Sequence, residues 1–448
     1  MSTIAELFAA RVPRYTSYPT APHFHSGISA DVYRRWLEEL NPAKPLSLYV
    51  HIPFCDTLCW FCGCHTTVVN RYSPVTSYLE LLLEEIELVA RILSPGRPVS
   101  HIHWGGGSPT LLNPADIRRL DDAVRRNFSI AKDVEFGIEI DPRGFARPLA
   151  ETLAAIGVTR ASIGVQDCDP VVQRAINRIQ AIETTANAVE LLRSVGIARL
   201  NVDLIYGLPH QTIAGIERTA DAVLPLQPDR FAIFGYAHVP SFKKHQALIP
   251  ESALPGIEER FAQAEAAHAR LCAHGYEPVG IDHYAKPDDP MAIALRAGRL
   301  ARNFQGYTTD KASALIGLGA SSIGSLPQGY AQNITDVPGY RAALASGRLP
   351  VARGVALTAE DRARRAVIER LMCDLVVDLD DVAAFYGIKR SNFDDALRSL
   401  DGLQDLGVVT VDRARIVVDA RWRAATRLVC AAFDGYLNNG VGRHALAV

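Results

Sequence analysis

The stretch "YVHIPFCDTLCWFCGC" (residues 49–64) places four of the chain's eight cysteines within ten positions. Their spacing is Cys55-x3-Cys59-x2-Cys62-x-Cys64. The remaining cysteines are scattered along the chain, at Cys168, Cys272, Cys373 and Cys430. A single dense cluster, in a chain that otherwise uses cysteine sparingly, indicates metal or redox chemistry rather than a disulfide framework.

The rest of the composition is ordinary for a globular protein. The 448 residues suffice for about two or three domains, and 48% are hydrophobic against 21% charged. A formal net charge of −2 gives no electrostatic reason to expect a nucleic acid partner. No apolar run approaches about 18 residues, so no membrane span is expected. The segment "MSTIAELFAARVPRY" lacks a secretory signal pattern. We therefore expect the protein to be located in the reducing cytoplasm.

Short apolar runs alternate with amphipathic stretches between about residues 46 and 325. The stretch 77–93, for example, carries leucine and isoleucine at helical spacing. This alternation predicts an α/β fold with βαβ units and a parallel sheet, in the form of a partial (β/α) barrel. A doubly wound open sheet is the second interpretation. The predicted strands are 46–52, 99–104, 134–140, 160–165, 200–206 and 230–236.

Polar residues lie at or near the carboxyl ends of four of these strands: Glu139, Gln166, Asp203 and His238. In parallel α/β folds the active site lies beyond those ends, so one small ligand could contact all four side chains. Each residue taken alone could equally cap a helix or end a strand.

The pattern changes on both sides of this region. Residues 12–24, "VPRYTSYPTAPHF", are too rich in proline and aromatics for a helix and indicate an extended arm. Thr358 is a helix cap before an acidic first turn, and 408–418 has the pattern of a hairpin. We predict three parts: an N-terminal arm (1–45), a catalytic barrel (46–355) and a small, mainly helical, winged-helix-like C-terminal domain (356–448).

Two kinds of metal site compete for the clustered cysteines. Structural zinc usually takes two ligand pairs separated by about a dozen or more residues, whereas these ligands crowd one loop. Three thiolates at x3 and x2 spacing can instead hold three corners of a cubane iron–sulfur cluster. Such a cluster leaves one iron open to a small chelating molecule.

The C-x3-C-x2-C pattern after the first predicted strand, with Phe61 before the third cysteine, resembles the radical S-adenosylmethionine (SAM) enzymes. The resemblance implies a [4Fe-4S] cluster held by Cys55, Cys59 and Cys62, with SAM chelating the open iron. It also implies reductive cleavage of SAM to a 5′-deoxyadenosyl radical. "WGGGSPT" (104–110) is similar to the family loop that contacts the SAM amino group. A glycine triplet alone also fits a tight turn or a phosphate-binding loop.

Further matches lie in segments 13–21, 49–55, 103–110, 164–167, 201–209, 236–240, 281–289 and 302–309. On these segments the chain is similar, within that superfamily, to the oxygen-independent coproporphyrinogen III oxidases of haem biosynthesis. Ser108 stands where threonine is expected in many relatives, and both residues supply a hydroxyl. The resemblance implies decarboxylation of the ring A and B propionates of coproporphyrinogen III to vinyl groups, giving protoporphyrinogen IX. The unactivated propionate β-carbon has no acidic proton, so acid–base catalysis cannot start this reaction, whereas a carbon radical can remove the hydrogen.

The resemblance also implies two SAM molecules and assigns residues to them. The cluster-bound SAM is expected to contact Tyr49, Gly106, Glu139 and Ile323. The second SAM is expected to contact Phe61 (through its backbone), Gly107, Ser108, Gln166, Arg178, Asp203 and Ala237. Catalytic roles are assigned to Cys64, Tyr49 and Glu139.

Some of these roles keep alternatives. Arg178 could fork onto a carboxylate or be a helix-surface arginine. Cys64 could contact the cluster ligands without binding iron itself, or it could take part in electron or hydrogen transfer. Gln305 and Tyr307 are candidate pocket residues.

Three functions are compatible with the sequence: the radical SAM decarboxylase, a haem- or porphyrin-binding chaperone without this turnover, and a zinc-stabilised scaffold. For the enzyme we expect a low-potential electron donor, such as flavodoxin or ferredoxin, and a monomer.

Overall fold

A twelve-stranded sheet forms the centre of the protein, whose computed structural model describes residues 10–93 and 96–437. The strand order is β16-β15-β14-β13-β1-β4-β5-β6-β7-β8-β10-β9. Strands β13 to β8 in this order are mutually parallel, and the order does not close. Strands β1 to β8 of this run follow one another in chain order without the reversal of a doubly wound sheet, as predicted for a partial barrel. The parallel strands are β1 Leu46–Ile52, β4 Pro98–Gly106, β5 Ser129–Ile140, β6 Arg160–Gln166, β7 Arg199–Tyr206, β8 Arg230–Gly235 and β13 Ala314–Leu318.

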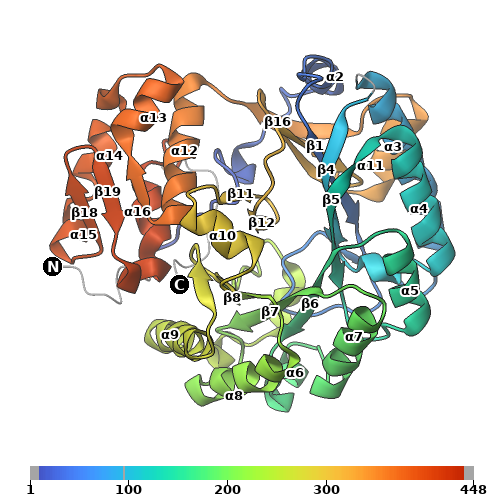
Figure 1. Cartoon of the computed structure of the whole chain (residues 1–448), viewed down its shortest axis with the longest axis horizontal. Coiled ribbons are helices and arrows are strands. Elements are labelled where there is room, and N and C mark those ends of the chain that lie inside the picture. The colour runs from blue at the N-terminus through green and yellow to red at the C-terminus, as the bar shows by residue number, and fades with distance from the viewer. Residues whose placement is uncertain (1–9, 94–95, 438–448) are drawn as a thin grey trace.

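Helices cover the outer face of this sheet, as Figure 1 shows along the right and lower edges of the molecule. Strand β1 is buried along its whole length except at Tyr49, as expected for a parallel strand with one face under helices. Helix α3 begins earlier than predicted, because Pro74 suits a first helical turn. The helices are α3 Ser73–Ile92, α4 Pro114–Asn127, α5 Arg147–Ala155, α6 Pro170–Ala175, α7 Ile182–Ser194, α8 Ile213–Val223 and α9 Ile257–Ala273.

Antiparallel strands extend both edges of the sheet, which the sequence analysis did not predict. Their runs are too short to stand out from loops by periodicity. These strands are β14 Ile323–Leu326, β15 Gly329–Asn333 and β16 Val351–Ala356 at one edge, and β10 His283–Ala285 and β9 Glu277–Val279 at the other. Smaller elements are the pairs β2 Phe54–Cys55 with β3 Thr67–Val68 and β11 Ala301–Asn303 with β12 Gly306–Thr308, and the helices α10 Pro290–Arg296 and α11 Val337–Ala345.

One buried carboxylate ties the antiparallel edge to the helical layer. Glu85 of α3 accepts hydrogen bonds from the Gly319 N–H (2.6 Å), the Asn333 amide (2.6 Å) and the Tyr340 hydroxyl (2.5 Å). Burial raises the pKa of Glu85 to about 7, and these three donors oppose that rise. The contacts fix the position of β13, which is the neighbour of β1 in the sheet.

The C-terminal elements form a second hydrophobic core, drawn in orange and red in Figure 1. The predicted hairpin is present, and β17 completes a three-stranded sheet with it. The elements are α12 Ala359–Asp374, β17 Val376–Asp378, α13 Leu379–Tyr386, α14 Asp394–Arg398, α15 Asp401–Asp405, β18 Val409–Asp412, β19 Arg415–Val418 and α16 Thr426–Ala432. The domain boundaries stay a prediction.

The N-terminal arm packs into this second core. Val12, Tyr15 and Tyr18 are buried there, and the Tyr15 hydroxyl donates to Asp434 Oδ2 at 3.1 Å. A helix that was not predicted, α2 (Ala30–Glu38), lies within the predicted arm, after its extended segment 12–24. Among the described residues, no helix combines the length and the apolar composition that crossing a bilayer requires.

Candidate active site

Cys55 ends β2, and Cys59, Cys62 and Cys64 follow on the loop between β2 and β3, directly after β1; we call residues 55–64 the cysteine loop. All four are free thiols. Cys59 is buried, Cys55 and Cys62 are half-buried, and Cys64 is exposed. The Thr66 hydroxyl donates to Cys55 Sγ at 3.2 Å. The loop therefore offers several sulfurs at different depths, close to the carboxyl ends of the parallel strands.

The glycine loop (residues 104–110) packs backbone to backbone against the cysteine loop. The Gly107 N–H donates to the Ile52 carbonyl (2.8 Å), and the Ser108 N–H donates to the Phe54 carbonyl (2.7 Å). A Cβ added at Gly107 would lie 2.4 Å from the Phe54 carbonyl oxygen. Gly106 has a φ of +115°, and a Cβ there would lie 2.5 Å from the His51 ring. Side chains at these two positions would force the loops apart.

Two arginines share a carboxylate beside Cys59. The Arg143 guanidinium donates to Cys59 Sγ at 3.6 Å, and Arg178 donates to the same sulfur at 3.5 Å. Asp141 binds both, at 2.6 Å to Arg143 Nη2 and 3.1 Å to Arg178 Nη1. Donors of this kind stabilise a thiolate ligand.

The sequence analysis missed Asp141 and Arg143. The signal was present, because Asp141 directly follows β5 and strand ends were already singled out.

Arg178 is not a surface arginine, because only 6% of it is exposed. It lies between α6 and α7, and its Nη2 also donates to the Gly164 carbonyl at 2.7 Å. Its Nε is buried without a hydrogen-bond partner among the described residues. The helix-surface alternative is therefore wrong, while the carboxylate-binding role stays a prediction.

Cys62 and Cys64 form an unequal pair. The Cys64 N–H donates to Cys62 Sγ at 3.4 Å. A hydrogen bond from the Cys64 side chain lowers the pKa of Cys62 to about 7, against the opposing effect of burial, and the pKa of Cys64 is raised by the same contact. Cys62 is thus the more acidic thiol of the pair and Cys64 the less acidic one.

The start of a short 3-10 helix (Lys244–Leu248), with Lys243 before it, holds the cysteine loop through the carbonyl groups of that loop. Lys243 Nζ donates to Cys64 O (2.9 Å), His245 Nε2 to Cys62 O (2.8 Å) and Gln246 Nε2 to Phe61 O (2.9 Å). The sequence carried no sign of these contacts, because they join positions about 180 residues apart.

Tyr49 begins a chain of hydrogen bonds across the end of β1. Its hydroxyl is 2.9 Å from His51 Nδ1, and His51 Nε2 is 3.0 Å from the His65 carbonyl. Because a carbonyl only accepts, the His51 Nε2 carries the proton and Tyr49 donates to Nδ1. Burial lowers the pKa of His51 and raises that of Tyr49 well above its usual value. Both groups are therefore neutral near pH 7.

Glu139 and Asp203 line one polar cavity of about 220 Å³ inside the barrel. Glu139 accepts from the Gly106 N–H at 3.0 Å and lies 3.5 Å from His103 Nε2. Burial acts to raise the pKa of Glu139, but His103 and the Gly106 N–H outweigh it, so this pKa is lowered. Burial raises the pKa of Asp203 to about 6, although Ser162 donates to it at 2.9 Å.

The other predicted strand-end residues do not join this cavity. Gln166 has a φ of +72°, and its amide folds back over Gly164. His238 turns instead to the Tyr236 hydroxyl at 2.9 Å and to Glu251 at 3.7 Å. The expectation that one ligand contacts all four strand-end side chains therefore holds in this structure only for Glu139 and Asp203.

The remaining predicted contacts surround the two loops. Ile323 lies near Tyr49. Tyr49 of β1 pairs with Gly317 of β13, and a Cβ added to Gly317 would lie 2.8 Å from the Ile323 backbone. The Ser108 hydroxyl is 3.2 Å from that of Thr110. Phe61 and Ala237 are half-buried.

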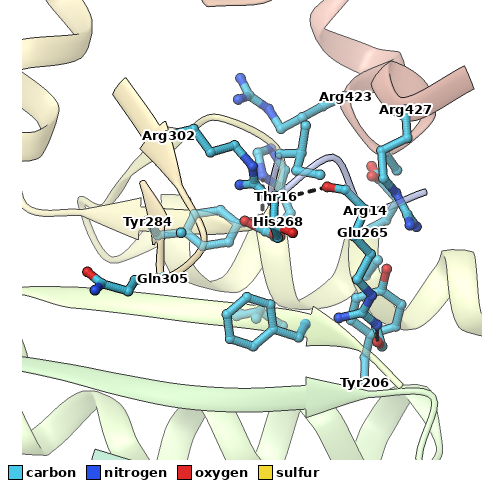
Figure 2. Close-up of a pocket in the computed structure, with 18 of the residues that line it drawn as sticks. Arg14, Thr16, Tyr206, Glu265, His268, Tyr284, Arg302, Gln305, Arg423 and Arg427 are labelled. Atoms are coloured by element: carbon cyan, nitrogen blue, oxygen red, sulfur yellow. Dashed lines mark hydrogen bonds between the residues drawn. The ribbon is translucent and has the colours of Figure 1, made fainter. Parts of the chain in front are cut away.

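A larger cavity of about 670 Å³ reaches the cysteine loop at Cys64. Figure 2 shows the arginine side chains around it, with Tyr206 and Tyr284 among its walls. Gln305 lines this cavity, as predicted for a pocket residue, whereas Tyr307 lines the smaller polar cavity. The arginines come from the N-terminal arm, β11 and the C-terminal segment: Arg14, Arg302, Arg421, Arg423 and Arg427.

Comparison with known proteins places this geometry in a family. Residues 49–223 match the radical SAM superfamily model. The chain is 48% identical, over 98% of its length and 97% of the relative's, to an oxygen-independent coproporphyrinogen III oxidase of Bradyrhizobium diazoefficiens. The chain belongs to the oxygen-independent coproporphyrinogen III oxidases. An oxidase of the same name from Cereibacter sphaeroides is 45% identical over 96% of this chain and 95% of its own.

The fold of this coproporphyrinogen oxidase family member agrees with a solved relative. Coproporphyrinogen III oxidase from Escherichia coli, described as a radical SAM enzyme, superimposes with a TM-score of 0.90 and 40% identity. The match covers 95% of this chain and 98% of that one. The predicted family, its fold and an oxidoreductase activity are confirmed, and the superfamily implies a [4Fe-4S] cluster and SAM as cofactors.

The donor set of this oxidase suits such a cluster. The sulfurs of Cys55, Cys59 and Cys62 occupy separate positions on one loop. This arrangement fits a cluster in which each cysteine binds a different iron. In the described parts of the chain, no three His, Cys, Asp or Glu side chains converge to share one metal ion. The individual roles of the predicted site residues stay predictions.

The first test separates ligands from neighbours. Cys55→Ala, Cys59→Ala and Cys62→Ala should each abolish the visible absorbance of the anaerobically reconstituted protein, since thiolates assemble the cluster. Cys64→Ser should keep both the cluster and SAM binding, measured by iron content and equilibrium dialysis. An iron loss in Cys64→Ser equal to that in Cys59→Ala would show that the ligand set is misassigned.

The second test concerns the charges beside Cys59. Arg143→Gln should move the midpoint potential of the cluster to a more negative value, because a cation and its N–H···S donor are lost. Asp141→Asn should move it in the opposite direction. The measurement is a redox titration followed by electron paramagnetic resonance, with Arg126→Gln on α4 as the control. Shifts of the same sign in both variants would contradict an electrostatic role.

Proposed function

We propose that this protein converts coproporphyrinogen III to protoporphyrinogen IX without oxygen, by turning the ring A and B propionates into vinyl groups. The observation that carries the proposal is that Cys64 of the cysteine loop lines the large arginine-rich cavity. The names of the relatives support the substrate. Radical generation and substrate binding would thus be next to each other.

The large cavity has the chemistry of a tetrapyrrole site. Aromatic and apolar side chains form much of its wall, including Phe234, Tyr206 and Tyr284, and they suit the pyrrole rings. Five arginines line it against two carboxylates, Glu265 and Asp282. This excess of cations suits a substrate with a propionate on each ring.

One arginine of the cavity has a donor left over for a carboxylate. Arg302 stacks 4.6 Å over the Tyr307 ring, and its Nη1 is buried without a hydrogen-bond partner in the described part of the chain. A propionate would accept from this Nη1 and remove the cost of the unsatisfied buried donor. Arg427 adds charge to the same cavity, because burial lowers its pKa only to about 10, which leaves it charged at neutral pH.

The cluster and SAM, when bound, supply a carbon radical that can remove a hydrogen atom from the propionate. For each propionate, the substrate loses one hydrogen atom, carbon dioxide and one electron, and an alkene remains. The chain's own side chains position the reacting carbon and exclude water. The Glu139 carboxylate, bonded to the Gly106 N–H, is suited to hold an ammonium group near the glycine loop.

The finer assignments belong to this proposal. Two SAM molecules would serve the two decarboxylations, with Arg178 and Asp203 at the second. Cys64 would act between the cluster and the large cavity. The electron donor would be flavodoxin or ferredoxin, the protein would be a monomer, and the clustered thiols favour the cytoplasm.

The test is anaerobic turnover of coproporphyrinogen III with SAM and dithionite, followed by chromatography of the oxidised porphyrins. Protoporphyrin should form through a mono-decarboxylated intermediate. Arg302→Gln should raise the KM for the porphyrinogen about 10- to 100-fold, the value of one charge-assisted hydrogen bond. Its cluster absorbance should be unchanged.

Tight porphyrin binding without any decarboxylated product would favour the chaperone instead. Stoichiometric zinc without labile sulfide would favour the scaffold.

A further inference from the structure

A second hollow lies against the cysteine loop, with a volume of about 1,110 Å³. We name it the basic groove. It is lined by residues that follow Cys64, by residues 242–245 and by the start of α11. Cys64 is the only residue that lines both this groove and the large arginine-rich cavity, so the two hollows reach the cysteine loop at the same residue.

The groove is cationic. Arg71, Lys243, Lys244 and Arg341 line it, and Asp336 is the one carboxylate among its lining residues. That carboxylate caps α11 by accepting from the Gly339 N–H at 2.7 Å. The positive charge therefore lies open to a partner.

The two histidines of the groove also face the cysteine loop. Burial, with a smaller effect from Lys243, lowers the pKa of His65 to about 4, so this ring is neutral at pH 7. His245 is held by its bond to the Cys62 carbonyl.

The floor and the rim of the groove have different chemistry. Lys243 and His245 donate to carbonyls of Cys64 and Cys62, so part of the groove wall is bonded directly to the loop that carries the cluster ligands. At the rim, Phe242 is 60% exposed and Val68 is 37% exposed. Exposed apolar side chains among cations are the composition expected of a transient protein contact.

We propose that the basic groove is the docking surface for a small acidic protein that carries one electron at low potential. This inference rests on the proposed function, because SAM cleavage at the cluster requires an electron from outside the chain. The electron passes from the reduced carrier to the oxidised cluster, and no bond forms or breaks in either protein. Complementary charge speeds such encounters, and interfaces of electron-transfer pairs are small.

The experiment compares two reductants in the full chain. The double variant Lys244→Glu/Arg341→Glu changes two exposed cations of the groove and leaves Lys243 and His245, which bond to the cysteine loop, in place. Purified flavodoxin, kept reduced, is the protein donor, and dithionite is the small one. The matched control is Arg126→Glu, an exposed cation of α4 on the outer helical layer.

With flavodoxin, the double variant should show a donor KM raised about tenfold and a weaker dependence on salt, since two charges of the encounter are reversed. With dithionite, its turnover, its KM for the porphyrinogen and its cluster spectrum should equal those of the wild type. Arg126→Glu should change neither.

Three results would overturn the proposal. Equal losses with both reductants would mean that the groove acts on the active centre rather than on the donor. An unchanged flavodoxin KM would mean that the donor docks elsewhere. A raised KM for the porphyrinogen with dithionite would make the groove part of the substrate site. A wild-type protein inactive with dithionite would instead reject the proposed function itself.

Discussion

The close contact between the glycine loop and the cysteine loop is the constraint on which the site depends. The peptide groups of Gly107 and Ser108 bond to β1 and to Phe54 at distances that leave no space for a Cβ at Gly107. This contact fixes the first half of the cysteine loop over the ends of β1 and β4. The segment 243–246 holds the second half by its carbonyls, so both halves of the cysteine loop are tied to neighbouring segments.

Several charged groups surround the cysteine loop. Asp141 holds Arg143 and Arg178 against Cys59, and the pKa of Cys62 falls to about 7 through its contact with Cys64. The large cavity and the basic groove both reach Cys64, and both are cationic. The first suits a substrate rich in carboxylates, and the second suits an acidic protein. Positive charge near the cysteine loop also favours reduction of a cluster bound there.

Sequence alone predicted the parts of the fold that repeat. Six of the seven parallel strands follow from alternating apolar runs, and the three-cysteine loop follows from its spacing, whereas β13 was not predicted. The search for polar residues at strand ends predicted Glu139 and Asp203 as site residues. It did not predict Asp141, which directly follows the same strand as Glu139. The short antiparallel strands gave no periodic signal. The arginine-lined cavity could not be predicted, because Arg14, Arg302 and the C-terminal arginines meet only through tertiary packing.

The proposed function requires that the radical chemistry acts on a propionate held beside the cysteine loop. The most direct measurement uses coproporphyrinogen III deuterated at the propionate β-carbons, with mass spectrometry of the 5′-deoxyadenosine formed in an anaerobic reaction. We expect deuterium in the deoxyadenosine in step with loss of carbon dioxide. Decarboxylated product accompanied by deoxyadenosine without deuterium would contradict the proposed function.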